Sequence, residues 1–422
     1  MSDGPASSPR SSPRSSPEGS AKFSSYQKRL LVFLSVASFF EGYDFFALTQ
    51  ILPNLRADLG VDEGGAGLLI GFINCGTILA FVLARQADRW GRKPLLTLTI
   101  IGYTVFTFLS GLSPNVYVFA LLQMVARIFL IAEWATSNVI AAEEYSAKGR
   151  GTVLGIVSAS GGFGAIVCAG LVPVLLHTAY GWRSVYLVSL VPLVVLALAR
   201  RGLRETRRFE AQKQAGPAES LFAIWSTAHR RRVVQLAAIW FLTYICTQNA
   251  VTFWKEFAVH ARGLSDAQVG NAVKLSALVS MPLAFAAGKM LDVVGRKVGA
   301  TLIYAATIIG VLGAYTAHSV LALTAFLVFA VLGVNTVLTV LNAFTTELFP
   351  TRYRASAFAW SNNVIGRIGY CISPVAIGAL VPKFGWGPTL AATTVFPLLA
   401  LILIWLTLPE TRGRELEETA LL

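Results

Sequence analysis

Hydrophobic residues in this chain are grouped into long runs, which short polar and basic stretches separate. Each run reaches the roughly 20 residues that a helix needs to cross a bilayer, and glycine and proline inside such runs are normal for membrane helices. The pattern predicts twelve membrane-spanning helices at residues 29–54, 64–84, 94–113, 115–141, 151–176, 183–201, 230–258, 267–288, 298–317, 319–346, 354–381 and 387–408. An even number of spans puts both chain ends on one side of the membrane.

Charged motifs between these runs repeat at one fixed spacing. The sequence DRWGRK at residues 88–93 returns 204 residues later as DVVGRK at residues 292–297. Three further positions return at the same spacing, with Glu143, Tyr145 and Arg150 matched by Glu347, Phe349 and Arg354. A duplicated unit of about two hundred residues explains this agreement. Six spans in each copy let the two copies point the same way.

The repeat predicts how the chain is divided. We expect residues 26–201 and 230–408 to form two six-helix bundles, joined by a cytoplasmic linker at 202–229. Residues 1–25 carry a Ser/Pro/Arg repeat that is too poor in apolar residues to fold, so we expect a disordered cytoplasmic tail there; residues 409–422 form a second tail. The predicted fold class is an all-α membrane protein with twelve transmembrane helices in two bundles related by a parallel repeat.

Composition agrees with a membrane protein and argues against other classes. Hydrophobic residues make up 55% of the chain and charged residues 14%, whereas soluble proteins carry roughly a quarter charged residues. The net charge of +13 would suggest nucleic-acid binding in a soluble protein, but the basic residues here lie between apolar runs. We therefore expect no nucleic-acid partner. Metalloprotease, serine-hydrolase and nucleotide-loop motifs do not occur, so we expect neither an enzyme nor a cofactor or metal.

The distribution of Lys and Arg predicts the orientation in the membrane. Of the 35 Lys and Arg residues, 27 fall in segments on the side that holds both chain ends. The opposite side carries only Arg56, Arg183, Arg262 and Lys383. Because Lys and Arg concentrate in cytoplasmic loops, we expect both termini to be cytoplasmic. The predicted location is the plasma (inner) membrane, with the lipid bilayer around a monomer.

These motifs resemble the major facilitator superfamily over essentially the whole chain after residue 25. ARQADRWGRK at 84–93 resembles the family signature between helices 2 and 3, and ELFPTRYR at 347–354 resembles a loop of sugar porters and organic-ion transporters. EGYD at 41–44 resembles a motif of aromatic-acid/proton symporters, and RIGYCISP at 367–374 one of organic-anion transporters. The resemblance implies a two-bundle transporter fold with a substrate site near the membrane midplane.

Charged residues in the cytoplasmic loops of both repeats form a candidate gate. Its members are Asp88, Arg89, Gly91, Arg92, Glu143, Glu144, Arg150, Asp292, Gly295, Arg296, Glu347 and Arg354. Ion pairs between the two bundles would hold the cytoplasmic side shut, and water-exposed pairs worth about 0–1 kcal/mol can break in each cycle. The alternative is that these residues only anchor the loops. An anchor does not need Asp and Gly at fixed spacing, so we favour the gate.

Charges inside the predicted spans are functional candidates, because a charged side chain near the bilayer centre costs at least about 2.5–3.5 kcal/mol. Glu41 and Asp44 share a face of the first span, and Arg127 lies midway along the fourth span with Glu133 turned away from it. The resemblance implies that Asp44 faces Arg127. We interpret Asp44, Arg127, Glu41 and Glu133 as proton-coupling residues, since protonation of Asp44 would free Arg127 for an anionic substrate. The alternative is a static ion pair.

Polar side chains on several spans form a candidate substrate site. Its members are Arg367, Asn363, Trp360 and Tyr370 on the eleventh span, Tyr244, Gln248 and Asn249 on the seventh, Asn335 on the tenth, and Trp134 on the face of the fourth that carries Arg127. A guanidinium matches a carboxylate in a bidentate manner, so two buried arginines favour an organic anion. Arg367 could instead pair with a protein acid, and polar stripes can simply hold helices together.

The sequence therefore predicts a secondary active transporter. It would move a small organic anion, such as a carboxylate or an aromatic acid, in symport with protons and by alternating access. A facilitator or proton antiporter for sugars or drug-like neutral solutes is the alternative, because Asn and Gln in the seventh span would also bind a polyol. A non-transporting membrane receptor is the third possibility.

Overall fold

The computed structural model of the protein describes residues 23–145, 147–188, 191 and 221–412. Both predicted tails, the predicted linker and most of the sixth predicted span lie largely or wholly outside these residues. In the first half of the chain the described helices are α1 (Ser25–Leu59), α2 (Glu63–Ala84), α3 (Ala87–Trp90), α4 (Arg92–Gly111), α5 (Val116–Glu144), α6 (Ala147–Leu176) and α7 (Arg183–Leu187).

The second half is described from a short 3-10 helix onward. Its elements are η2 (Leu221–Ser226), α10 (Arg230–Thr252), α11 (Trp254–His260), α12 (Asp266–Val294), α13 (Arg296–Thr316), α14 (Val320–Glu347), α15 (Thr351–Phe358), the π-helical segment η3 (Ala359–Gly366), α16 (Arg367–Phe384), α17 (Trp386–Ala392) and α18 (Val395–Thr407). Eleven segments of the described chain are long and apolar enough to cross a membrane. They confirm eleven of the twelve predicted spans; the remaining one, 183–201, is described only in part.

Helix ends follow ordinary capping rules. Ser24 caps α1 and Ser265 caps α12, each in a capping box with a glutamine three residues later. Asp62 and Asn115 cap α2 and α5 with their side-chain oxygens.

One predicted boundary was wrong: the seventh span does not continue to residue 258, because α10 stops at Thr252 and α11 starts as a separate short helix.

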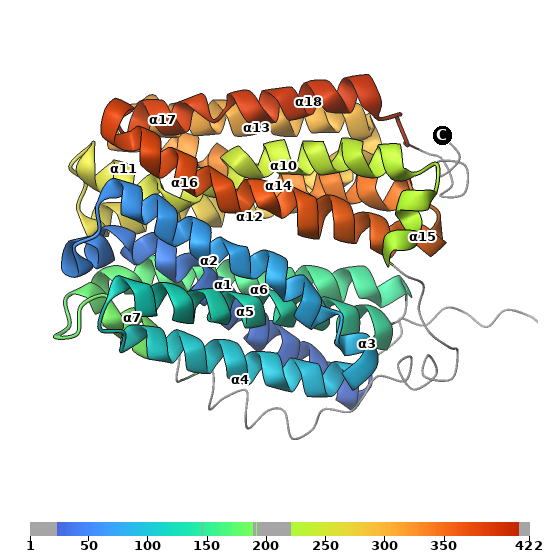
Figure 1. The fold of residues 1–422 in the computed structure, drawn as a ribbon, viewed down its shortest axis with the longest axis horizontal. Helices are drawn as coiled ribbons and strands as arrows, with labels where there is room; N and C mark the ends of the chain where they lie inside the picture. The colour runs from blue at the N-terminus through green and yellow to red at the C-terminus, as the bar shows by residue number, and fades with distance from the viewer. Residues whose placement is uncertain (1–22, 146, 189–190, 192–220, 413–422) are drawn as a thin grey trace, which may run out of the picture.

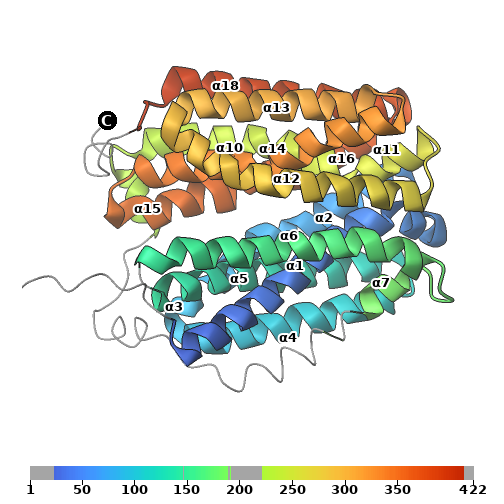
Figure 2. The same cartoon turned by 180° about the vertical axis from the view of Figure 1, so that it is seen from behind.

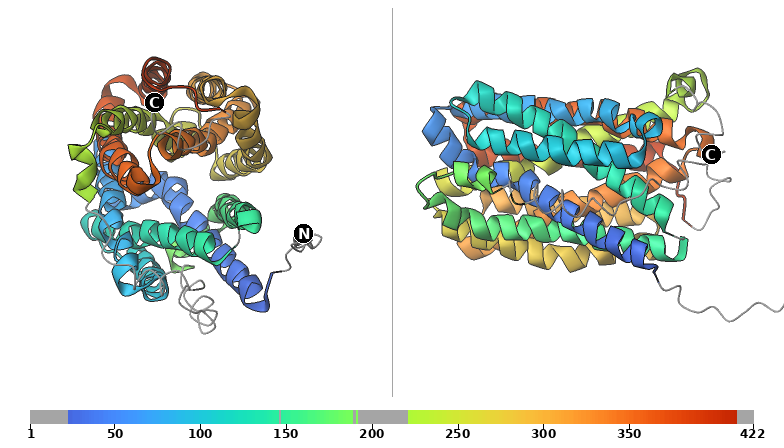
Figure 3. Two further views of the ribbon diagram at one scale, coloured as in Figure 1. Left: turned by 90° about the vertical axis from the view of Figure 1, so that its right-hand side faces the viewer. Right: turned by 90° about the horizontal axis from the view of Figure 1, so that it is seen from below.

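The helices are arranged as two bundles that lie side by side with their axes roughly parallel (Figure 1). Helices α1–α7 form the first bundle and α10–α18 the second, and the two groups are distinct when viewed end-on (Figure 3). From behind, α6 of the first bundle faces α12 of the second (Figure 2). One end carries α3 and α15, close to where the described chain stops; we call it the terminal end. The other end, which carries α7, α11 and α17, is the far end.

The hydrophobic core shows that the bundles are joined at the far end. The largest cluster of buried residues contains Ile51 and Leu55 of α1 together with Phe253 and Trp254 of the second bundle. The other two clusters each belong to a single bundle. One, which includes Phe344 and Phe349, lies in the second bundle, and the other, around Leu34 and Tyr145, lies in the first. The bundles therefore share a core at the far end and have separate cores toward the terminal end.

Candidate functional site

Two acidic side chains lie buried in the middle of α1. Glu41 is 5% exposed and Asp44 is 7% exposed, and their spacing of three places them on one face of the helix. Among the described residues, neither Oε1 of Glu41 nor Oδ2 of Asp44 has a hydrogen-bond partner. Buried polar groups are normally hydrogen-bonded, so these unsatisfied oxygens mark a candidate functional site.

Arg127 of α5 faces the same region and is also incompletely satisfied. Its side chain is buried, and its guanidinium lies 4.6 Å from the centre of the Phe45 ring. Its Nη1 has no hydrogen-bond partner in the described chain. Asp44 lies within electrostatic range of Arg127, but the two do not form a direct ion pair in this conformation. The two charges thus lie near each other without a direct contact, and their pairing during the working cycle stays a prediction.

Glu133, one turn and a half further along α5, lies against Glu41 rather than Arg127. Its side chain is fully buried, and no described donor reaches either of its oxygens. Its carboxyl lies within electrostatic range of the carboxyls of Glu41 and Asp44. Like charges so close in a buried site repel each other, so Glu41 and Glu133 form a second acidic pair beside Asp44.

Arg367 lies where η3 meets α16 and reaches across to the first bundle. Its Nη1 donates to the backbone oxygen of Thr77 on α2 over 2.9 Å, and the phenol of Tyr244 lies within electrostatic range of its guanidinium. The phenol of Tyr370 lies within electrostatic range of both Arg367 and Arg127. The two arginines, one from each bundle, therefore act on a common region between the bundles.

Uncharged polar groups surround this region on the second bundle. The hydroxyl of Tyr244 donates to Oδ1 of Asn362 over 2.9 Å. Nδ2 of Asn249 donates to Oγ of Ser373 over 2.6 Å, while its Oδ1 is buried without a partner. These groups fix the orientation of α10 against η3 and α16.

The π-helical turn changes which residues of the eleventh span face the site. A π-helix has five-residue hydrogen-bond spacing, so it adds a residue to the turn and rotates the positions before it. Asn362 in this turn accepts from the hydroxyl of Tyr244. Nε1 of Trp360 donates to the backbone oxygen of Leu221 over 3.0 Å, against η2. The roles of Trp360 and Asn363 in substrate binding stay predictions.

In the described chain, three other predicted substrate-site residues have no side-chain hydrogen bond or ion pair. Trp134 is 49% exposed on α5, Gln248 is half-buried on α10, and Asn335 is exposed on α14. Their role in substrate binding stays a prediction. Within the described residues, no group of three or more His, Cys, Asp and Glu side chains is arranged to hold a metal ion.

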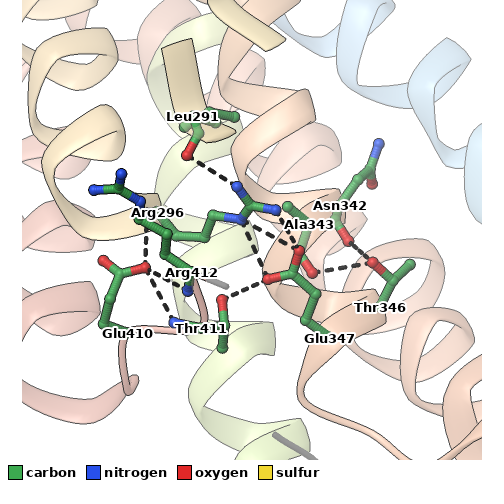
Figure 4. Close-up of polar contacts among 9 residues, drawn as sticks. All are labelled: Leu291, Arg296, Asn342, Ala343, Thr346, Glu347, Glu410, Thr411 and Arg412. Carbon is green, nitrogen blue, oxygen red and sulfur yellow. Dashed lines mark hydrogen bonds and ion pairs between the residues drawn. The ribbon is translucent and has the colours of Figure 1, made fainter. Parts of the chain in front are cut away.

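The repeated charged motifs lie at the terminal end and join helices within each bundle. In the first bundle Arg92 pairs with Glu143 over 3.1 Å. In the second bundle Arg296 pairs with Glu347 over 2.8 Å, and Glu347 also accepts from the hydroxyl of Thr411 (Figure 4). The two halves of the repeat therefore use the same pair of positions to connect equivalent helices.

Each copy of the repeated motif needs a glycine directly before its arginine. Gly91 and Gly295 have φ angles of 100° and 96°, a region that other residues rarely adopt. Each allows the chain to turn sharply so that the following arginine begins the next helix. In the second bundle this turn lets Glu410 accept from the backbone N–H groups of Arg296 and Lys297 over 2.8 and 2.9 Å.

Among the side chains that the structure describes, the pairs of Arg92 with Glu143 and of Arg296 with Glu347 each lie within one bundle and do not connect the two. Arg354 donates to the backbone oxygen of Phe349 rather than to Glu347, Arg89 is exposed, and the backbone oxygen of Glu144 accepts from Gln27. The side chains of Asp88, Arg150 and Asp292 lie outside the described part of the structure. Closure of the terminal end by these residues stays a prediction.

Sequence reasoning missed several polar residues that the structure brings together. Asn362 was missed because a π-helical turn has no clear sequence signal. The contact of Glu133 with Glu41 follows from how α1 packs on α5, and spacing within one helix cannot show it. Arg56 and Glu256 form an ion pair at the far end. An acidic residue directly after Lys255, within an apolar stretch, was the available signal for that pair.

Comparisons with known proteins match this geometry to one family. The sequence model of the Major Facilitator Superfamily matches residues 34–374 and, in a second alignment, residues 236–421. A putative niacin/nicotinamide transporter of Bacillus subtilis is 24% identical over 400 residues, covering 93% of this chain and 98% of that protein. A gallate transporter of Pseudomonas putida is 26% identical over 410 residues, covering 88% and 89%. The crystal structure of a D-xylose-proton symporter shares the fold, with a TM-score of 0.74 and 16% identity over 92% of this chain and 100% of that one.

Proposed function

Because this chain belongs to the Major Facilitator Superfamily, whose members that it resembles are transporters and not enzymes, we propose that it moves a small organic anion across the membrane in symport with protons. The observation that carries the proposal is the buried pair of Asp44 and Arg127, which lie near each other and are each left with an unpaired polar atom. Such groups persist in a buried site when a ligand or a proton completes them during the working cycle.

Arg127 supplies the primary contact for the anion. A carboxylate can accept from its free Nη1 while the Phe45 ring holds the guanidinium in place. Arg367 is positioned on the opposite bundle and could exchange its bond to the Thr77 backbone for a bond to the substrate. An anion held by arginines from both bundles would draw the bundles together. Gallate, named for one relative, is an aromatic carboxylate and fits this arrangement.

Asp44 couples this binding to protons. When Asp44 is ionised, it competes with the substrate for Arg127. When Asp44 takes up a proton, the positive charge of Arg127 is left without a counter-charge and attracts the anion. Binding of proton and anion therefore favour each other. The carboxyls of Glu41 and Glu133 lie beside Asp44 and would be a second place at which the site exchanges protons.

The conformation fits one stage of an alternating-access cycle. The bundles share a core at the far end and are separate toward the terminal end. The concentration of Lys and Arg near the chain ends supports a cytoplasmic location of the terminal end, so the proposal assigns this structure to an inward-facing state in the plasma (inner) membrane. When that end closes, the gate residues of both repeats would meet between the bundles.

A transporter for neutral sugars is the second candidate. The uncharged groups of Tyr244, Asn249 and Asn362 would suit hydroxyl groups of a polyol. The two candidates differ in what the buried arginines do: they bind the substrate in the first case and only stabilise the protein in the second.

A matched pair of ligands separates these candidates. Nicotinate and nicotinamide have the same ring and nearly the same shape, and differ in charge. We expect the purified full-length protein to be stabilised against heat by nicotinate or another aromatic carboxylate, since a ligand stabilises the state that it binds. Nicotinamide and monosaccharides should have little effect, and Arg127→Gln should remove the difference. Stabilisation by monosaccharides alone would support the sugar transporter instead.

A further inference from the structure

At the far end, a group of charged residues links α1 of the first bundle to α11 of the second. Nη1 of Arg56 lies 2.6 Å from Oε2 of Glu256. Nζ of Lys255 donates to the backbone oxygen of Gln50 over 2.5 Å and also lies 2.5 Å from Oδ1 of Asp266. Glu256 is fully buried, and the side chain of Lys255 is only 2% exposed. We call Arg56, Lys255, Glu256 and Asp266 the far-end latch.

The short helix α11 is held to the second bundle by hydrogen bonds and a contact between aromatic rings. Nε1 of Trp254 donates to the backbone oxygen of Ala314 over 3.3 Å, and the rings of Phe257 and Tyr315 lie 5.0 Å apart. The hydroxyl of Tyr315 donates in turn to the backbone oxygen of Ala250. Anchored in this way, α11 moves with the second bundle while Lys255 and Glu256 point toward α1.

Separation of the bundles at the far end must break polar contacts of this latch as well as the shared apolar core. Asp266 belongs to the second bundle and stays with Lys255, whereas the bond from Lys255 to Gln50 and the pair between Arg56 and Glu256 cross between bundles. Polar pairs that are desolvated in one state and hydrated in the other set the equilibrium between the two states.

We propose that α11 is the far-end gate of this transporter, and that Glu256 and Lys255 determine how readily the bundles part there. The proposal rests on alternating access as proposed above, and not on the identity of the substrate. Neither residue contacts the region of Asp44 and Arg127 directly, so both act as positioning residues for the cycle.

The burial of Glu256 gives this gate a defined pH dependence. Burial raises the pKa of Glu256 from 4.5 to about 7, outweighing the attraction of Arg56. Its other charged neighbours are Glu63 on α2 and Lys255 and His260 on α11. When the gate opens and Glu256 meets water, its pKa returns toward its ordinary value. The closed state thus binds more protons, and the state that binds more protons is favoured as the pH falls.

A lower pH therefore favours the closed far end, and a higher pH favours the open one. With a pKa of about 7 for the closed state, the ratio of closed to open molecules should rise roughly tenfold from pH 8 to pH 6. His260 opposes this change only toward the acid end, because burial and Arg56 lower its pKa. An acidic exterior would then restrain the outward opening of an empty transporter.

Distance measurements between spin labels test the proposal in the full-length protein in nanodiscs. Ala57 on α1 and Lys383 on α16 are exposed at the far end of different bundles and can be labelled as cysteines, with the exposed Cys75 replaced by serine. We expect a long-distance population that falls roughly tenfold relative to the short one between pH 8 and pH 6. Lys255→Ala should raise the long-distance population at both pH values.

Glu256→Gln and one control complete the test. Glutamine copies the protonated carboxyl, so this variant should stay closed at both pH values and lose the pH dependence. Asp58→Asn is the matched control, because Asp58 pairs with Arg183 over 2.5 Å at the same end but within the first bundle; it should behave as the wild type. An unchanged pH response in Glu256→Gln, or unchanged distances in Lys255→Ala, would overturn the proposal. The assay requires no transport, so the proposed substrate and proton coupling stand or fall separately.

Discussion

A close backbone contact between the bundles gives a sharp test of their movement. Gly67 of α2 lies against α16, and a Cβ at this position would overlap the backbone oxygen of Pro374 and lie 2.8 Å from Cα of Gly378. Carbon atoms prefer separations of about 3.5–4.0 Å, so Gly67→Ala requires the two backbones to move apart by about 1 Å. Both partners are backbone atoms, and a side-chain rotation cannot relieve the overlap.

The expected effect is on the conformational equilibrium rather than on folding. Overpacking of this kind costs about 1–3 kcal/mol, and only the state that is closed at the far end suffers it. The population should shift toward far-end opening by about 5–150-fold. The spin-label pair at Ala57 and Lys383 measures that shift directly. Uptake should slow, because the inward-facing state becomes harder to reach.

Two other glycines serve as controls for this variant. A Cβ on Gly288 of α12 would meet no atom within 4 Å, so Gly288→Ala should leave the distances unchanged. A Cβ on Gly164 of α6 would overlap the backbone oxygen of Phe39 inside the first bundle, so Gly164→Ala should lower the unfolding temperature without favouring far-end opening. If Gly67→Ala gave the wild-type distances, the reasoning about this contact would be refuted.

Further changes test the charged groups. Arg127→Gln should weaken nicotinate binding by about 10–100-fold, since hydrogen bonds to charged groups contribute about 1.5–3 kcal/mol; calorimetry would show this, and wild-type affinity would argue against the site. Glu133→Gln should keep or raise the unfolding temperature, because it removes one of two buried carboxyls that repel each other; a large loss would contradict this reading of the pair. Glu347→Ala should destabilise the second bundle by about 1–3 kcal/mol, because it leaves Arg296 and Thr411 without their shared acceptor. Unchanged thermal unfolding of that variant would contradict the structural role of the pair.

Much of the fold could be predicted from the sequence because a bilayer limits the possible solutions. Apolar runs of membrane-spanning length must form helices, and the repeated motif with Gly91 and Gly295 marks equivalent turns in the two halves. The position of Asp44 and Arg127 near each other was also predictable, through resemblance to symporters. These features depend on local sequence or on a repeat, and both can be read without coordinates.

The missed features depend on tertiary packing. The π-helical turn before Arg367 contains Asn362, which bonds to Tyr244, and Trp360, which bonds to the backbone of Leu221. The end of α10 at Thr252 cannot be read from hydropathy, because Trp254 and Phe257 are as apolar as a membrane span. This break puts Lys255 in the far-end latch instead of deep in a span. For the pair of Arg56 with Glu256, the sequence signals only that Glu256 lies in an apolar stretch and does not identify its partner.

The claim that Asp44 couples substrate movement to protons can be tested by one comparison in proteoliposomes. For the wild type, an inwardly directed proton gradient should drive accumulation of labelled nicotinate, and nicotinate should also exchange in counterflow without a gradient. Asp44→Asn resembles the protonated state, so it should retain counterflow and lose accumulation driven by the gradient. Gradient-driven accumulation at the wild-type level in Asp44→Asn would contradict the account.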